Sequence, residues 1–70
     1  MAEVRAEMVA NVWRVLVAEG DQVAEGDTLV ILESMKMEIP VLAENGGVIS
    51  KLHVAEGDVV QEDELIAVVD

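Results

Sequence analysis

The sequence repeats itself, and this internal repeat limits the folds open to the chain more than any other feature. Shifting the 70-residue sequence by 37 positions aligns residues 4–33 with residues 41–70 without a gap. The pentapeptide VAEGD lies at equivalent places in the two halves, at 17–21 and 54–58, and occurs again at 23–27. A chain this short supports only one core. The repeat therefore predicts a single domain, residues 1–70, made of half one (4–33), a linker (34–40) and half two (41–70). We call two residues that lie 37 positions apart mates.

Each half consists of short apolar runs separated by turn residues, so we predict an all-β fold without helices. The runs are rich in branched residues, as in VWRVLV, TLVILE, GVISKLHV and LIAVV. Glycine in each VAEGD can adopt a positive φ, and the aspartate after it can accept a bond from nearby backbone, so these segments predict turns. A calcium site is the weaker alternative, because the alternating aspartates of a calcium-binding loop are missing.

Two positions in each half break the alternation expected of a strand. Trp13 aligns with Ser50, and Leu16 aligns with His53, so apolar and polar residues exchange places across the repeat. A β-bulge or a strand buried on both faces would account for this. We expect the single tryptophan to serve packing and not to hold a cofactor.

The acidic composition argues against several classes of partner. The chain has a net charge of -11, and its four cations are scattered, so it should repel nucleic acids and anionic lipids. It lacks cysteine, which suits a reducing compartment, and no apolar run is long enough to span a bilayer. We therefore expect a cytoplasmic protein without a nucleic-acid or membrane partner.

No group of residues in the sequence resembles a catalytic or metal site. Ser34, Ser50, Thr28 and His53 could in principle supply a nucleophile and a base, but nothing in the pattern brings them together. A single histidine without cysteine is a poor basis for a transition-metal site. We predict no catalytic residue and no metal, and we expect that the chain is not an enzyme.

The linker holds the most unusual segment, ESMKMEIP at residues 33–40. If the halves are related by a two-fold axis, this linker is a tight hairpin with Lys36 at its tip and Pro40 on an edge strand. The same symmetry predicts that Val4 and Asp70 lie near each other, far from Lys36. The lysine is thus expected to project from the end opposite the termini.

Three interpretations of Lys36 follow from its surroundings. A solvated surface lysine is the commonest case, yet Met35 and Met37 beside it are flexible apolar side chains of the kind that partner proteins grip. A Schiff-base lysine needs a desolvated pocket or a cationic neighbour, whereas Glu33 and Glu38 flank this one. The third interpretation is an exposed amine to which a second enzyme attaches a group.

The segment around Lys36 resembles the attachment site of the biotinyl domains of biotin-dependent carboxylases. ESMKME is similar to the E-A-M-K-M of that family, and it is preceded by G-D-x-L-x-x-x-E and followed by V-x-E-G-D-x-V. The resemblance covers nearly the whole chain, and the flanking methionines distinguish it from the related lipoyl domains. It implies a flattened barrel, or sandwich, of two four-stranded antiparallel sheets with pseudo-two-fold symmetry.

The resemblance also implies a function. Lys36 would be joined to biotin by a biotin protein ligase through biotinyl-AMP, with Glu33, Ser34, Met35 and Met37 as recognition residues. The domain, a monomer without activity of its own, would shuttle carboxybiotin between a biotin carboxylase and a carboxyltransferase. The alternatives are a free-standing biotinylated storage or regulatory protein and a lipoyl-type acyl carrier.

Three departures from the family pattern are apparent. Ser34 replaces the usual alanine, which adds a hydroxyl beside the attachment turn. Ala10 replaces a glycine that its mate Gly47 retains, so the first half is expected to pack differently there. Asp63 replaces a turn glycine at the mate of Gly26. Because the halves align without a gap, no room remains for the inserted "thumb" of some bacterial carriers.

Overall fold

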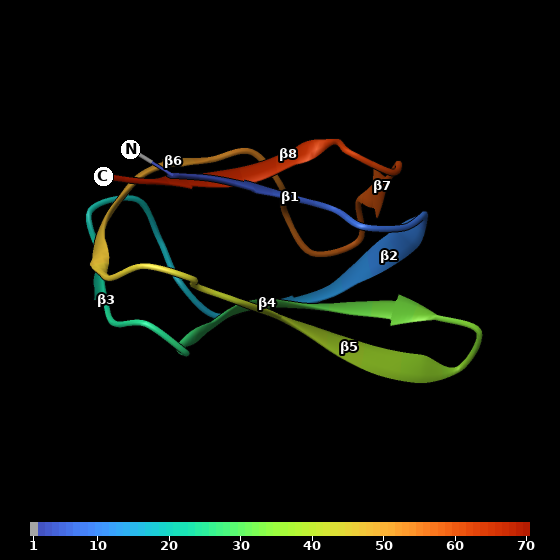
Figure 1. Cartoon of the computed structure of the whole chain (residues 1–70). Helices are drawn as coiled ribbons and strands as arrows, with labels where there is room; N and C mark the ends of the chain where they lie inside the picture. Colours follow the sequence, from blue (N-terminus) through green and yellow to red (C-terminus); the bar gives the residue numbers. More distant parts are fainter. Residues whose placement is uncertain (1) are drawn as a thin grey trace.

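The computed structural model describes residues 2–70 and consists of eight strands in two four-stranded antiparallel sheets (Figure 1). The strands are β1 (Ala2–Arg5), β2 (Ala10–Val15), β3 (Gln22–Val23), β4 (Thr28–Ser34), β5 (Met37–Leu42), β6 (Gly47–Leu52), β7 (Val59–Val60) and β8 (Leu65–Val69). The predicted all-β fold is therefore confirmed. Within residues 2–70, no helix is long and apolar enough to cross a membrane.

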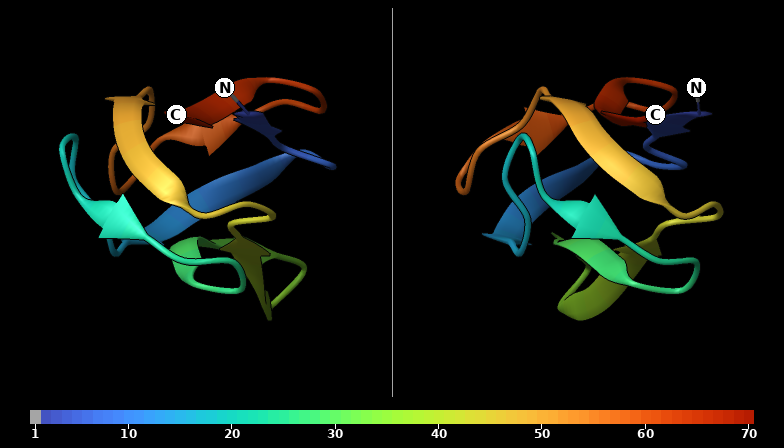
Figure 2. Two further views of the ribbon diagram at one scale, coloured as in Figure 1. Left: turned by 60° about the vertical axis from the view of Figure 1, so that its left-hand side comes forward. Right: turned by 90° about the vertical axis from the view of Figure 1, so that its left-hand side faces the viewer.

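The two sheets are related by the symmetry that the repeat predicts. One has the strand order β1-β8-β6-β3 and the other β5-β4-β2-β7, so replacing each strand by its equivalent in the other half converts one order into the other. The pairing register agrees, because Val4 lies opposite Ala67 and its mate Val41 lies opposite Val30. Each sheet thus contains strands from both halves, as the two views in Figure 2 show.

The chain termini lie side by side at the end of the molecule opposite the β4–β5 turn (Figure 1). Ala2 pairs with Val69 at that end, while Val4 pairs with Ala67, three residues before Asp70. The molecule measures 31 × 17 × 17 Å, so its long axis separates the two ends. The expected remoteness of the termini from Lys36 is confirmed.

Of the two explanations for the broken alternation, a bulge is the correct one, and it occurs at both equivalent positions. The β2–β4 register shifts between Val12 and Arg14, and the β6–β8 register shifts between Ile49 and Lys51. Trp13 and its mate Ser50 are therefore the extra residues. The expectation that Trp13 serves packing was wrong, since it is 40% exposed and lies outside the core cluster. The bulge directs the Trp13 side chain toward solvent, whereas strict alternation would bury it.

The VAEGD segments form the turns predicted for them. Gly20, Gly26 and Gly57 have φ of 94°, 90° and 95°, and the following aspartate accepts a hydrogen bond from the backbone N–H three residues before it. Asp63 takes the same place in a fourth turn with φ 70°, and there Glu64 accepts the bond from Gln61. The fourth turn therefore keeps its shape without glycine.

The core fills the space between the sheets with residues whose mates are also apolar. The fully buried side chains include two mate pairs, Leu29 with Ile66 and Val12 with Ile49. Ala10 is buried, and φ is positive at its mate Gly47 but not at Ala10, so the two halves do differ there. A Cβ at Gly47 would meet the carbonyl oxygen of Asp70. Close approach of β6 to the chain end thus requires glycine in half two.

Candidate functional site

The ESMKME segment forms the far end of the β4–β5 hairpin, at the right of Figure 1. The two strands pair from Thr28–Leu42 to Ser34–Met37, which leaves only Met35 and Lys36 in the turn. Both strands are anchored, because Leu32 is buried in the core and Ile39 opposite it packs against the core. Pro40 lies on β5, an edge strand, where its missing N–H leaves no ladder bond unmade.

The turn has an uncommon backbone conformation. Met35 has φ 53° and Lys36 has φ 64°, and a two-residue hairpin loop with both φ positive is a type I′ turn. Such turns favour asparagine and glycine, because other residues bring Cβ too close to the carbonyl oxygen, at a cost of about 1–2 kcal/mol per residue. Backbone strain of this kind is concentrated at functional sites. One of the two strained residues is Lys36, the lysine at the centre of the ESMKME segment.

The side chains at the turn are presented to solvent. Met35 is 91% exposed and Met37 is 63% exposed, the two largest fractions among the exposed large hydrophobic residues of the described chain. Lys36 between them is exposed as well, and Ser34 is half-buried. The hairpin therefore holds one primary amine at its tip with an apolar side chain on either side.

The strand residues behind the turn carry negative charge. Glu33 lies directly opposite Glu38, and both are exposed. Like charges in this position repel each other. The only ion pair within residues 2–70 joins Arg5 to Glu3, so neither glutamate is neutralised by a salt bridge of the described structure. A cation supplied by another molecule would relieve the repulsion.

All five residues that the sequence singled out, Glu33, Ser34, Met35, Lys36 and Met37, thus lie on one hairpin tip. The residues weighed for hydrolysis are spread over the fold, with Thr28 on β4, Ser50 on β6 and His53 after β6. Ser50 instead donates a hydrogen bond to the carbonyl of Val68. Among residues 2–70, no group of three or more histidine, cysteine or acidic residues could hold a metal ion.

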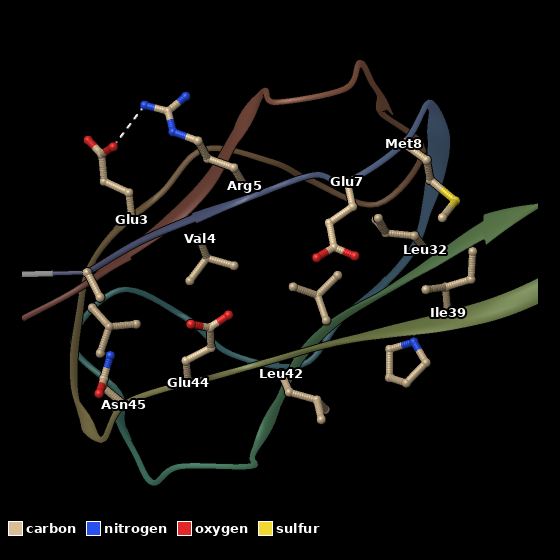
Figure 3. A pocket seen from close by; sticks show the side chains of 14 residues that line it. Glu3, Val4, Arg5, Glu7, Met8, Leu32, Ile39, Leu42, Glu44 and Asn45 are labelled. Carbon is tan, nitrogen blue, oxygen red and sulfur yellow. Dashed lines mark hydrogen bonds and ion pairs between the residues drawn. The ribbon is translucent and has the colours of Figure 1, made fainter.

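Sequence reasoning missed a groove of about 340 Å³ between the edge strands β1 and β5 (Figure 3). Its fourteen lining residues form seven mate pairs: Ala2/Ile39, Glu3/Pro40, Val4/Val41, Arg5/Leu42, Glu7/Glu44, Met8/Asn45 and Leu32/Val69. The groove therefore follows the symmetry of the fold, as the gap where the two edge strands do not pair. At its rim, the hydrogen bond and charge of Glu3 raise the pKa of Arg5. Lys36 is not among its residues.

Sequence reasoning also missed the left-handed conformation of the turn. The sequence has no direct signal for it, because the turn residues are methionine and lysine and the register that leaves a two-residue loop is seen only in the structure. Such loops adopt turns of types I′ and II′.

Comparison with known proteins agrees with this geometry. The family model described as "Biotin-requiring enzyme", of the biotin/lipoyl type, matches residues 2–69. Over 70 residues the chain is 63% identical to the "Biotinylated protein TB7.3 homolog" of Mycobacterium leprae, with 99% of each covered.

Two much longer proteins contain a similar segment. The "Biotin-dependent acyl-coenzyme A carboxylase alpha3 subunit" of Mycobacterium leprae is 44% identical over 64 residues, which are 91% of this chain and 11% of that subunit. The crystal structure of the Kluyveromyces lactis urea carboxylase superposes with a TM-score of 0.91 at 33% identity. That match covers 99% of this chain but only 6% of the carboxylase.

Proposed function

Because the chain belongs to the biotin/lipoyl attachment family, we propose that Lys36 is the residue that carries biotin and that the chain works as a biotin carboxyl carrier. The observation that carries the assignment is the type I′ turn, which holds one exposed primary amine between two exposed methionines. Covalent attachment suits this site, because a single accessible amine suffices and no binding pocket is needed. The domain supplies an attachment point and not a catalytic group.

The chemistry at Lys36 is the formation of an amide. In the active site of a biotin protein ligase, the Nζ amine attacks the acyl carbon of biotinyl-AMP, the bond to the phosphate breaks, and AMP leaves as a proton is lost from nitrogen. Exposure of Lys36 allows the ligase to enclose it, and Met35 and Met37 offer flexible apolar contacts on both sides. Glu33 and Ser34 lie on the strand that enters the turn and complete the recognised segment.

Once attached, biotin supplies a ureido nitrogen that carries a carboxyl group from a biotin carboxylase to a carboxyltransferase. The hairpin keeps the attachment point in one place, because six residue pairs join β4 to β5 and core residues anchor them. A tether on a rigid support raises the local concentration of its cargo at both active sites. The carboxylase similarities support this role. We further propose that the carrier is a cytoplasmic monomer.

The assignment of Lys36 is tested by biotinylation of the purified chain with a biotin protein ligase, ATP and biotin, followed by intact mass spectrometry. The wild type and Lys51→Arg should each gain one biotinyl group, and Lys36→Arg should gain none. Lys51 is the matched control, since it is the only other lysine and is also exposed. A biotinyl adduct on the Lys36→Arg chain would refute the assignment, and a native adduct of lipoate would favour the acyl-carrier alternative.

A biotinylated protein without a carboxylase role is the second candidate, because the Mycobacterium leprae homologue that matches over 99% of both chains is named only as biotinylated. The two candidates differ in what the biotinylated chain does with labelled bicarbonate. A carrier should gain label only when a separate biotin carboxylase and ATP are added, and should then pass it to a carboxyltransferase of its host. If the label is gained but never transferred, the storage or regulatory role is the better account.

A further inference from the structure

The internal symmetry provides a way to separate what the fold needs from what it does not. A position required for packing should be apolar in both halves, as it is at Leu29 and Ile66. Among residues 2–70, seven of the nine exposed large hydrophobic residues lie outside the linker and have a mate, and every mate is polar or glycine. The pairs are Met8/Asn45, Val9/Gly46, Trp13/Ser50, Leu16/His53, Leu42/Arg5, Val48/Asn11 and Val59/Gln22. The fold therefore does not require these exposed apolar side chains.

Among these seven exposed apolar residues, three of the four that lie on strands belong to the sheet that carries the Lys36 hairpin. Of those seven, Trp13, Leu42 and Val59 lie on strands of the sheet β5-β4-β2-β7, and only Val48 lies on a strand of the other sheet. Two of the three, Trp13 and Val59, share the outer side of their sheet with Arg14, Ile31 and Pro40, and we call this surface the Trp13 face. Its mates on the other sheet are Ser50, Gln22, Lys51, Val68 and Glu3.

The pairing register places these residues side by side. Arg14 lies opposite Ile31, which lies opposite Pro40, and Val59 lies opposite Asn11. Their neighbours along the strands, such as Val12 and Leu32, are buried, so this set points away from the core. The guanidinium carbon of Arg14 is 4.9 Å from the centre of the Trp13 ring. The bulge at Trp13 is thus used to display a tryptophan and an arginine together.

We propose that the Trp13 face is the surface by which biotin protein ligase holds this chain while it modifies Lys36. The inference rests on the proposed function and adds to it a second contact remote from the hairpin tip. Tryptophan and arginine are the residues that most often dominate the binding energy of an interface. The ligase is the partner to which this applies most directly, because it acts on the chain before biotin is attached and has only protein surface to hold.

The distance between Trp13 and Lys36 suits a single interface. Trp13 follows Val12, which pairs with Leu32, and β4 ends two residues later at Ser34. The turn that holds Met35 and Lys36 begins there, so at the rise of a strand it lies about 10 Å from Leu32. A weak interface of about 600 Å² per partner is a disc about 28 Å across. An enzyme that encloses the hairpin tip can therefore also cover the Trp13 face.

The structure specifies the chemistry of the complementary surface. The ligase should offer an apolar pocket for Trp13 and Val59. It should also offer at least one cation toward Glu33 and Glu38, which lie in the same cross-strand row as Val59, on the other side of Asn11. The equivalent places on the other sheet hold Ser50 and Gln22. A ligase that requires the tryptophan would therefore bind only one of the two sheets.

The experiment measures steady-state biotinylation of the full chain by biotin protein ligase, with each exposed apolar residue replaced by its own mate. Trp13→Ser and Val59→Gln each introduce a residue that the fold already accepts at the equivalent position. Val48→Asn is the matched control, because it removes an exposed valine from the other sheet by the same rule. We expect Trp13→Ser to raise KM about tenfold, a difference of about 1.4 kcal/mol, without changing kcat.

Val59→Gln should raise KM by a smaller factor, and Val48→Asn should leave both constants as in the wild type. If the wild type is biotinylated and KM is unchanged in Trp13→Ser, or rises equally in Val48→Asn, the docking surface is refuted while the proposed function stands. If the wild type itself takes up no biotin, the proposed function and the docking surface fall together. Thermal unfolding followed by circular dichroism identifies a misfolded variant, and Val59→Gln then decides in place of Trp13→Ser.

Discussion

The strained turn makes a prediction that runs against ordinary expectation, namely that removing Met35 stabilises the fold. Met35 has φ 53°, and 91% of it is exposed, so its side chain contributes little burial. A residue other than glycine in this region costs about 1–2 kcal/mol, and asparagine avoids part of that cost by bonding its own backbone. We therefore expect Met35→Asn to raise the free energy of unfolding by about 1 kcal/mol.

For a domain of this size, 1 kcal/mol corresponds to an increase in Tm of about 4–8 °C. Thermal and urea unfolding followed by circular dichroism measure the change. Met37→Asn is the control, because Met37 is also exposed but lies on β5, where asparagine is disfavoured and φ is not positive. That variant should be no more stable than the wild type.

The same two variants separate stability from function. Both remove an apolar contact beside Lys36, so both should lower kcat/KM for biotinylation although only Met35→Asn unfolds at a higher temperature. Methionine in a turn that prefers asparagine would then be explained by recognition and not by folding. An unchanged or lower Tm for Met35→Asn, or an equal increase for Met37→Asn, would show that the turn is not strained as described.

Three further predictions concern the repeat. Asp63→Gly restores glycine at φ 70° and should raise the free energy of unfolding by about 0.5 kcal/mol in urea titrations. Gly57→Ala places a Cβ on a residue with φ 95° and should lower the free energy of unfolding by about 1–2 kcal/mol, although nothing lies within 4 Å of that Cβ. An unchanged midpoint of urea unfolding would contradict the conformational argument. Leu29→Ala and Ile66→Ala delete fully buried mates, and each should cost about 2–5 kcal/mol with a single unfolding transition. Two separate transitions would indicate that the halves do not share one core.

Much of the fold could be predicted because the local pattern indicates strands and the repeat relates the strands of one half to those of the other. Alternating apolar residues and glycine-aspartate turns indicate strands locally, while the gapless alignment of halves requires each strand to have an equivalent. The mismatch of Trp13 with Ser50 indicated an irregular strand at that position in both halves, and the structure decides between the two explanations in favour of a bulge.

The features that escaped prediction depend on contacts between distant parts of the chain. The two-residue turn is fixed by the register of β4 and β5, and this register is set by core-facing pairs such as Leu32 with Ile39. The sequence at the turn is Met-Lys, without the asparagine or glycine that would predict a type I′ turn. The expectation that Trp13 serves packing followed from the rule that a large apolar residue is usually buried, and it was wrong. Its polar mate, Ser50, was the evidence that the core does not use this position.

The pseudo-two-fold symmetry relates two ends of the molecule, and these ends differ in how their strands are connected. At one end β4 and β5 are joined by the two-residue turn, while at the other the equivalent strands β8 and β1 lie side by side with no connecting turn. The two-residue turn holds the ends of β4 and β5 together, so a residue in this turn is presented at a constant position, and Lys36 lies there. Because the linker is outside the repeat, Lys36 has no mate, so a single attachment point follows from the same asymmetry that interrupts an otherwise symmetrical fold.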